Sequence, residues 1–174
     1  VPELRQAWEA HLGDHVVRLE WSPDGATLAA AMIGGPILLF AADGRFLREL
    51  PGHSFGTLAI SWTADSRLLA SGGQDGYARI WEAATGEALH QLKCGAQWVE
   101  QVAFSPHRDY LLTGAGRFLK MWNGAGQHQR DFPDHPSTIT GIAWQPGELF
   151  FATVAYGQLA NYHAEKADFA KAFA

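Results

Sequence analysis

The chain has 174 residues, of which 47% are hydrophobic and 18% are charged, a composition that excludes a disordered, fibrous or membrane-embedded protein. Its net charge of -5, with basic residues scattered singly, argues against nucleic acid as a partner. The single cysteine, Cys94, cannot form an internal disulfide and no apolar stretch reaches the length of a membrane span, so we expect a soluble, cytoplasmic protein that binds no membrane.

The first strand that the sequence predicts covers residues 16–21, where polar and apolar residues alternate up to an aromatic residue. The same kind of stretch returns three times at intervals of about forty residues. The stretches read VVRLEW, TLAISW, VEQVAF and TITGIAW, and they end at Trp21, Trp62, Phe104 and Trp144. One strand is therefore repeated along the chain.

A turn follows each of these aromatic residues and leads to a second predicted strand. The turns are rich in Pro, Asp, Gly and Ser, as in the SPDG sequence of residues 22–25, and these residue types suit turn geometry. The second strands are small and apolar without alternation, which predicts burial on both faces. They read ATLAAAM, RLLASG, YLLTGA and LFFATVA.

A third predicted strand ends in another aromatic residue in each repeat, at Phe40, Trp81, Trp122 and Tyr162. More polar segments follow, RFLREL, EALHQL and QHQRDF, which suit exposed outer strands. Each repeat thus predicts a four-stranded antiparallel meander. Because one such meander cannot bury both of its faces, the meanders must stack side by side, and radial stacking gives an all-β propeller.

The second repeat resembles a WD repeat. It has Gly52 and His53 at its start, the sequence LASGGQDG over residues 69–76, and Trp81 followed by Glu82. The resemblance extends over most of the chain and implies a β-propeller with four-stranded antiparallel blades, four of which are present.

The implied organisation is a single propeller domain. Members of the family usually have seven or more blades, so we expect the four blades to belong to a larger ring that is incomplete here. The outer strand of a preceding blade is expected at residues 1–12, and residues 168–174 resemble the outer strand of the fourth blade. The blades themselves are expected at residues 13–51, 52–94, 95–134 and 135–174.

The resemblance also implies a buried network of His53, Ser71, Asp75 and Trp81 in the second blade. The other blades lack parts of this set; the fourth retains His135 but has Tyr156 at the aspartate position. We interpret the pairing of His53 with Asp75 as structural and not as a proton-transfer site, because the repeat predicts it without any substrate.

The sequence offers no catalytic constellation, no cofactor motif and no metal site. His11 and His15 are the closest histidine pair, but a spacing of four does not bring two imidazoles together outside a helix. Cys94 is expected to be a small packed residue. Glu100 is an anomaly because the other repeats have Val17, Leu58 and Thr140 at its position; we expect it to meet channel water or to pair with Arg18 or Arg117.

Binding is expected in the loops around the channel mouth, since loops on rigid scaffolds usually carry the contacts. The candidates are the large, polar or charged residues of these loops: His15, Phe55, Gln74, Trp98, Arg117 and Tyr156. An equally good interpretation of Phe55 and Trp98 is that they only cover the seams between blades.

We interpret the protein as a non-catalytic interaction scaffold for one or more protein partners. One alternative is a cofactor-binding or enzymatic propeller whose reactive residues lie outside this sequence. Another is a purely structural module of a longer chain. In isolation, the chain is expected to associate with itself through its exposed blade faces.

Overall fold

The structure is a computed structural model that describes residues 5–166 and 171–173. Within these residues it has sixteen β-strands in four sheets, and no helix. It follows that none of the described residues form a helix with the length and apolar character needed to cross a membrane. This confirms the predicted all-β fold.

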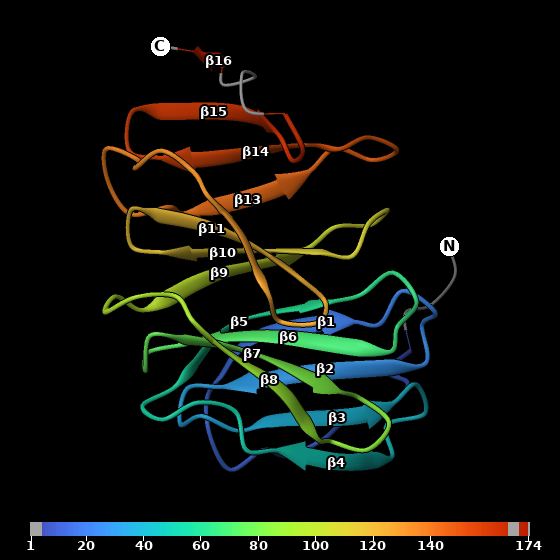
Figure 1. The fold of residues 1–174 in the computed structure, drawn as a ribbon. Coiled ribbons are helices and arrows are strands. Elements are labelled where there is room, and N and C mark those ends of the chain that lie inside the picture. Colours follow the sequence, from blue (N-terminus) through green and yellow to red (C-terminus); the bar gives the residue numbers. More distant parts are fainter. Residues whose placement is uncertain (1–4, 167–170, 174) are drawn as a thin grey trace.

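Each sheet is an antiparallel meander whose strands pair in chain order (Figure 1). Sheet 1 contains β1 (Val16–Trp21), β2 (Thr27–Met32), β3 (Ile37–Ala41) and β4 (Phe46–Leu50). Sheet 2 contains β5 (Thr57–Trp62), β6 (Leu68–Gly73), β7 (Tyr77–Glu82) and β8 (Ala88–Lys93). Sheet 3 contains β9 (Val99–Phe104), β10 (Tyr110–Ala115), β11 (Phe118–Asn123) and β12 (His128–Asp131).

Sheet 4 contains β13 (Gly141–Trp144), β14 (Phe150–Ala155), β15 (Gln158–His163) and β16 (Lys171–Phe173). The last of these strands pairs with β15 as the outer strand, while residues 168–170 and 174 of the segment expected there lie outside the described residues. The first strand of this sheet starts later than expected. The amide of Ile139 donates to the carbonyl of Gly116, in the turn between β10 and β11, at 2.8 Å, and the amide of Thr140 donates to the carbonyl of Val154 in β14 at 2.8 Å, so the chain before Gly141 bonds to both sheet 3 and sheet 4.

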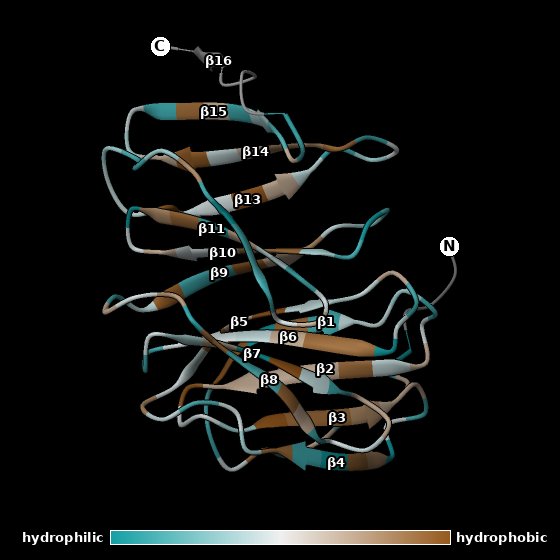
Figure 2. Ribbon diagram, viewed as in Figure 1, coloured by the Kyte–Doolittle hydropathy of each residue, from teal (hydrophilic) through white to brown (hydrophobic). Residues whose placement is uncertain are grey.

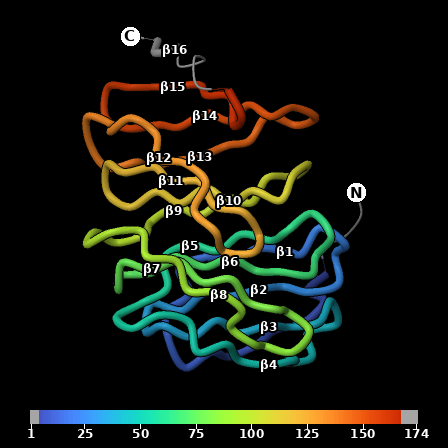
Figure 3. The backbone as a smooth tube through the Cα atoms, viewed as in Figure 1, coloured from blue at the N-terminus to red at the C-terminus, as the bar shows by residue number. Residues whose placement is uncertain are grey.

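The four sheets lie side by side as propeller blades, and the backbone passes from one to the next (Figure 3). The first strand of each sheet is innermost, so β5 contacts both β1 and β9, and β9 contacts β13. Sheets 1 and 4 lie at opposite ends of Figure 1, and the four sheets form an open arc.

Three apolar clusters fill the seams between neighbouring sheets, and the repeated aromatic residues of sheets 2, 3 and 4 lie in them. Trp62 and Trp81 of sheet 2 pack against sheet 1, and Phe104 and Trp122 of sheet 3 pack against sheet 2. The second strands of sheets 2 and 3 are buried on both faces as expected, and all six residues of β6 are buried. The expectation is wrong for β14, where Val154 is 41% exposed because no sheet covers that face. The outer strands carry more hydrophilic residues, as Figure 2 shows for β4.

The first-strand aromatic residues also form polar contacts across the seams. The Trp62 indole donates from Nε1 to the carbonyl oxygen of Glu20 at 3.2 Å. The Trp144 indole donates in the same way to Ala103 at 3.1 Å. Both acceptors directly precede the aromatic residue of the neighbouring sheet, so this contact recurs with the repeat.

In the described part of the chain, one face of sheet 1 and one face of sheet 4 have no neighbouring sheet. On sheet 1, Leu19 and Trp21 are 62% and 46% exposed, whereas Ile60 and Trp62 at the same positions of sheet 2 are 8% and 5% exposed. On sheet 4, Leu159 is 46% exposed, whereas residues at its position in the other sheets are fully buried. Exposure at these positions therefore depends on whether another sheet lies alongside.

The N-terminal segment covers part of the free face of sheet 1. The Trp8 ring stacks on Phe40 at a centroid distance of 6.0 Å, and its Nε1 donates to the carbonyl oxygen of Ala42 at 3.1 Å. A Cβ on Gly44 would lie 2.6 Å from Cγ of Trp8, so this approach requires glycine. Residues 5–12 form no strand, and their assignment to a preceding blade stays a prediction.

Candidate functional site

In a four-stranded meander, the start of the first strand and the turn between the second and third strands lie at the same edge. Backbone hydrogen bonds join these two segments across neighbouring sheets. The amide of His53 donates to the carbonyl of Gly35 at 3.4 Å, and the amide of His135 donates to that of Arg117 at 3.0 Å. We call this edge, on the left in Figure 1, the loop edge.

All the predicted partner-binding residues lie on the loop edge. Phe55, Trp98 and Tyr156 expose 81%, 52% and 89% of their surface. His15 and Arg117 are also exposed, and Gln74 is half-buried. The seam-covering interpretation of Phe55 and Trp98 fits poorly with these exposed fractions, since a side chain that covers a seam loses most of its contact with solvent.

The structure brings some of these residues together and leaves others apart. The amide of Gln74 donates to the carbonyl of Gly56 at 3.1 Å, which places it beside Phe55. Phe55 itself has a φ of 69°, a left-handed conformation that is uncommon for a bulky residue. Arg117 forms an exposed ion pair with Asp134 at 3.4 Å.

A groove runs along the loop edge of sheets 3 and 4, and we call it the loop-edge groove. It consists of two adjoining pockets that share Gln97, Gly116 and Thr138. The first pocket, of about 350 Å³, is also lined by Ala96, Trp98 and Glu100. The second, of about 330 Å³, is also lined by Arg117, Phe118 and Ser137.

Sequence reasoning singled out Trp98, Glu100 and Arg117 but missed the other polar residues of this groove. Gln97 and Ser137 lie in connections without a repeating pattern, and Thr138, expected at the start of a first strand, lies in the connection before β13. Only the packing of one sheet on the next shows that the three residues meet. The proposed pairing of Glu100 with Arg117 is wrong, because Arg117 pairs with Asp134 instead. Within the described part of the chain, Glu100 has no ion pair with Arg18 either.

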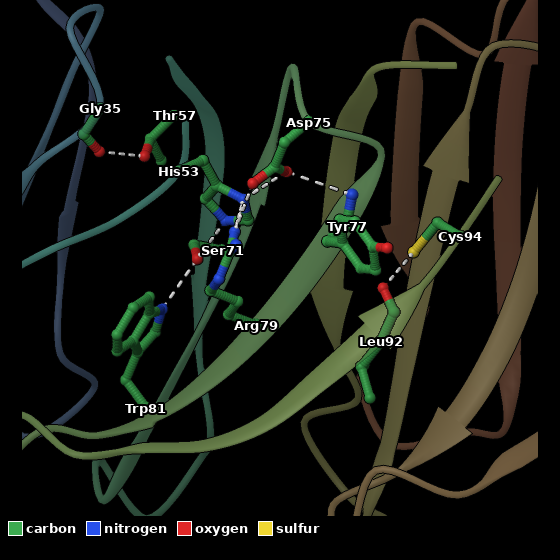
Figure 4. A network of polar contacts seen from close by, with 10 residues as sticks. All are labelled: Gly35, His53, Thr57, Ser71, Asp75, Tyr77, Arg79, Trp81, Leu92 and Cys94. Carbon is green, nitrogen blue, oxygen red and sulfur yellow. Dashed lines mark hydrogen bonds and ion pairs between the residues drawn. The ribbon is translucent and has the colours of Figure 1, made fainter. Parts of the chain in front are cut away.

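A polar network lies below the loop edge in sheet 2 (Figure 4). Trp81 Nε1 donates to Ser71 Oγ at 2.8 Å, and Ser71 Oγ lies 2.7 Å from His53 Nε2. His53 Nδ1 lies 2.9 Å from Asp75 Oδ1. The four residues named from the sequence are thus connected in one chain from the core to the turn.

The electrostatics of this network favour one arrangement of protons. Burial lowers the pKa of His53, although the hydrogen bond to Asp75 opposes this effect. Burial would raise the pKa of Asp75, but hydrogen bonds from His53 and Arg79 outweigh it and leave the pKa below its ordinary value. A neutral His53 that donates to ionised Asp75 and accepts from the Ser71 hydroxyl satisfies every group.

Arg79 is a member of the network that sequence reasoning missed. Its Nη1 donates to Asp75 Oδ2 at 2.7 Å and lies against His53 Nδ1. Two signals in the sequence indicate it. Arg79 stands two residues before Trp81, on the same face of β7, and four residues after Asp75.

Sheets 3 and 4 keep parts of the same network. In sheet 3, Trp122 Nε1 donates to Thr113 Oγ1 at 2.9 Å. In sheet 4, His135 Nε2 lies 2.7 Å from Thr153 Oγ1, and the buried Nδ1 atom of His135 has no partner among the described residues. Tyr156 occupies the position of the missing carboxylate.

The other candidates from the sequence do not gather into a site. Cys94 is buried, and burial raises the pKa of its thiol. No group of three or more His, Cys, Asp or Glu side chains that suits a metal ion occurs in residues 5–166 and 171–173. His11 is highly exposed and contacts Glu9 at 3.0 Å.

Comparison with known proteins identifies the repeat. The family described as "WD domain, G-beta repeat" matches residues 44–82 and 86–123. Each matched unit starts at the outer strand of one sheet and ends with the third strand of the next. The sequence repeat is therefore offset by one strand from the sheets, so every repeat ties two neighbouring sheets together.

Several curated proteins are similar to parts of this chain. The B-type cell cycle switch protein ccs52B of Medicago truncatula is 31% identical over 103 residues, which cover 57% of this chain and 21% of that protein. Apoptotic protease-activating factor 1 of Homo sapiens is 32% identical over 117 residues, covering 62% and 9%. Protein HIR1 of Cryptococcus neoformans is 26% identical over 176 residues, covering 87% and 20%.

Two solved structures share the fold. The structure of U3-55K superimposes with a TM-score of 0.86 at 20% identity, covering 94% of this chain and 53% of that one. The WD40 repeats of RRP9 give the same TM-score and identity, covering 94% and 52%. The chain thus spans about half of these propellers and about a fifth or less of the curated relatives.

Proposed function

We propose that the chain, which matches the WD-repeat family over residues 44–82 and 86–123 and shares the fold of WD40-repeat structures, is a non-catalytic scaffold that binds a protein partner through the loop edge. The family generally serves as a scaffold for protein interactions, and this supports the proposal. Its cellular location in this proposal is the cytoplasm, and the four sheets work as part of a larger ring.

The observation that carries the proposal is the distribution of exposed aromatic side chains. Phe55, Trp98 and Tyr156 are among the most exposed large apolar residues and share one edge of three consecutive sheets. Aromatic residues are enriched where proteins bind other proteins and are costly to leave in water. The nearby ion pair of Arg117 with Asp134 supplies a polar rim.

The left-handed backbone at Phe55 adds support. A bulky residue with a φ of 69° is conformationally unfavourable, and glycine or asparagine would fit the loop better. An aromatic residue that is 81% exposed and has an unfavourable backbone conformation is consistent with selection for binding.

The test uses variants of the loop edge and of the opposite edge. Phe55→Asn removes the aromatic ring and keeps a residue that tolerates the left-handed backbone, and Tyr156→Ala removes the second ring. Arg108→Ala is the matched control, since Arg108 is exposed in the turn between β9 and β10 at the other edge. Proteins retained by each variant are quantified by mass spectrometry, and the best candidate partner is then titrated as a purified protein.

We expect both loop-edge variants to weaken binding of the purified partner by about tenfold or more, as for central interface residues. Arg108→Ala should leave the affinity unchanged. Equal affinities for all three variants would show that the partner binds away from the loop edge, and loss of binding in Arg108→Ala alone would place the partner at the opposite edge. If no protein is retained by the parent chain, the purely structural module is favoured.

A further inference from the structure

We propose that the first pocket of the loop-edge groove holds a lysine or arginine side chain of the partner, between the ring of Trp98 and the carboxylate of Glu100. This inference deepens the proposed function and rests on it. It assigns the class of side chain that the protein recognises and the residues that recognise it. Both residues line the same pocket, together with Ala96, Gln97, Gly116 and Thr138.

Glu100 owes its position to a β-bulge. Where β9 pairs with β10, Gln101 lies opposite Gly114 and Val99 lies opposite Ala115, so Glu100 has no partner residue on the neighbouring strand. The same irregularity occurs in sheet 1 at Val17 and in sheet 2 at Leu58. A bulge redirects its side chain, and bulges are often found beside functional sites.

The residue type at this bulge is therefore the feature that distinguishes sheet 3. Val17 and Leu58 are half-buried apolar residues, and Glu100 is half-buried as well. Within the described residues, Glu100 forms no hydrogen bond or ion pair. Glu100 therefore presents an unpaired negative charge to the pocket where the other two bulges present an apolar side chain, and a cationic ligand would neutralise this charge.

Trp98 is the second residue that would bind the basic side chain. Its side chain is 52% exposed at the entrance to β9, two residues before Glu100. An indole face attracts a cation, and a carboxylate that lines the same pocket adds a charge-assisted hydrogen bond. Together they select a basic side chain with a long apolar stem, because the stem can lie along the ring.

The charges around the pocket agree with this choice. Among the residues that the structure describes, no lysine or arginine lines the first pocket. Arg117 lies in the adjoining pocket and is engaged by Asp134. An acidic side chain would meet the Glu100 carboxylate without a compensating cation, whereas a basic one neutralises it. The pocket volume of about 350 Å³ lies at the lower end of the range for ligand sites and suits one side chain.

The test follows the indole N–H signals of the tryptophans by two-dimensional NMR, with the signal of Trp98 assigned from Trp98→Phe. The probes are short Gly-Ser peptides that carry a single lysine, arginine, glutamate or leucine. We expect the lysine and arginine peptides to shift the Trp98 signal in a saturable manner. Glutamate and leucine peptides should leave it unchanged at the same concentrations.

Glu100→Gln keeps the shape of the side chain and removes its charge. We expect this variant to bind the lysine and arginine peptides about tenfold more weakly. Glu100→Leu reproduces the residue of sheet 2 and should abolish their binding without loss of thermal stability. The hydrogen-bonded indole signals of Trp62 and Trp81 report whether each variant keeps its fold.

Three results would overturn the proposal: no shift of Trp98 with basic peptides, an unchanged affinity in Glu100→Gln, or equal binding of the leucine peptide. The affinity of Phe55→Asn for the purified partner distinguishes failure of this proposal from failure of the scaffold function. If that variant loses the partner while Glu100→Gln retains it, the loop edge binds a protein and the basic side chain is not what the groove recognises.

Discussion

At the scale of single residues, His135 shows what the incomplete network of sheet 4 lacks. It is 1% exposed, and its Nδ1 atom has no partner among the described residues. Burial lowers its pKa, so the imidazole is neutral and has one N–H to donate. In sheet 2, the corresponding N–H of His53 reaches Asp75.

We therefore expect Tyr156→Asp to stabilise the protein by about 1 kcal/mol, because it supplies an acceptor for a buried donor. Tyr156 precedes Gly157, which has a φ of 70°, just as Asp75 precedes Gly76 with a φ of 79°. Tyr156→Ala is the control, since it removes the ring without adding an acceptor. Urea unfolding measures the stability of both variants. A Tyr156→Asp variant that is no more stable than Tyr156→Ala would contradict the prediction.

Glu20 makes stability depend on pH in a direction opposite to most carboxylates. Burial raises the pKa of Glu20 from 4.5 to about 7, opposed by a backbone hydrogen bond with Trp62. The folded state thus holds the proton more tightly than the unfolded state. The stabilisation is fully present below about pH 4.5 and is lost as the pH rises through about 7.

Glu20→Gln should remove this dependence. At pH 8, where Glu20 is ionised in both states, we expect the variant to be more stable than the parent by about 1–2 kcal/mol. At pH 5 the difference should be close to zero. Thermal unfolding of both proteins across this range tests the claim, and a stability difference that does not vary with pH would contradict it.

At the scale of the strand and the sheet, the indole contact between neighbouring sheets can be measured directly. Trp62→Phe keeps the ring in the seam and removes the hydrogen bond to the Glu20 carbonyl. We expect the free energy of unfolding to fall by about 1 kcal/mol, which is typical for loss of a part-buried neutral hydrogen bond. The structure itself places a phenylalanine at this position in sheet 3, so the ring is tolerated there.

Trp21→Phe is a matched control for this prediction. Trp21 occupies the same position in sheet 1, but it is 46% exposed and no sheet lies alongside to accept from its indole. The change in unfolding free energy should be much smaller than for Trp62→Phe. Equal effects for the two variants would show that the indole bond across the seam contributes nothing.

Most of the strands could be predicted from the sequence because each carries a local signal. Alternation up to Trp62, a turn and a small apolar strand define β5 and β6 without reference to the rest of the chain. The bond of Ile139 to Gly116, just before β13, could not be predicted, because Gly116 lies in the turn between β10 and β11 of another sheet. The loop-edge groove has the same origin and needs the packing of two sheets.

At the scale of the whole molecule, periodicity predicts that sheets stack but not which faces remain open. The same sequence positions are buried in one sheet and exposed in another: Leu159 is 46% exposed, while Leu119 at the same position of sheet 3 is 1% exposed. Nothing in the residues themselves distinguishes the two cases. The difference comes from the presence or absence of a neighbouring sheet.

The two open faces predict how the 174-residue chain behaves in solution. Leu19 and Trp21 on sheet 1 and Val154 and Leu159 on sheet 4 are each more than 40% exposed, although their counterparts lie in the seams of the fold. Contiguous apolar surface of this kind favours association. We expect the chain to form dimers or larger species whose proportion rises with protein concentration.

Sedimentation velocity at several concentrations tests this, with a variant that combines Leu19→Lys and Leu159→Lys. Because a charge on each open face must be desolvated on contact, the double variant should remain monomeric where the parent associates. Phe55→Asn is the control, since Phe55 is 81% exposed on the loop edge and lies on neither open face. A parent chain that stays monomeric throughout, or association that Phe55→Asn suppresses instead, would show that the sheet faces do not drive it.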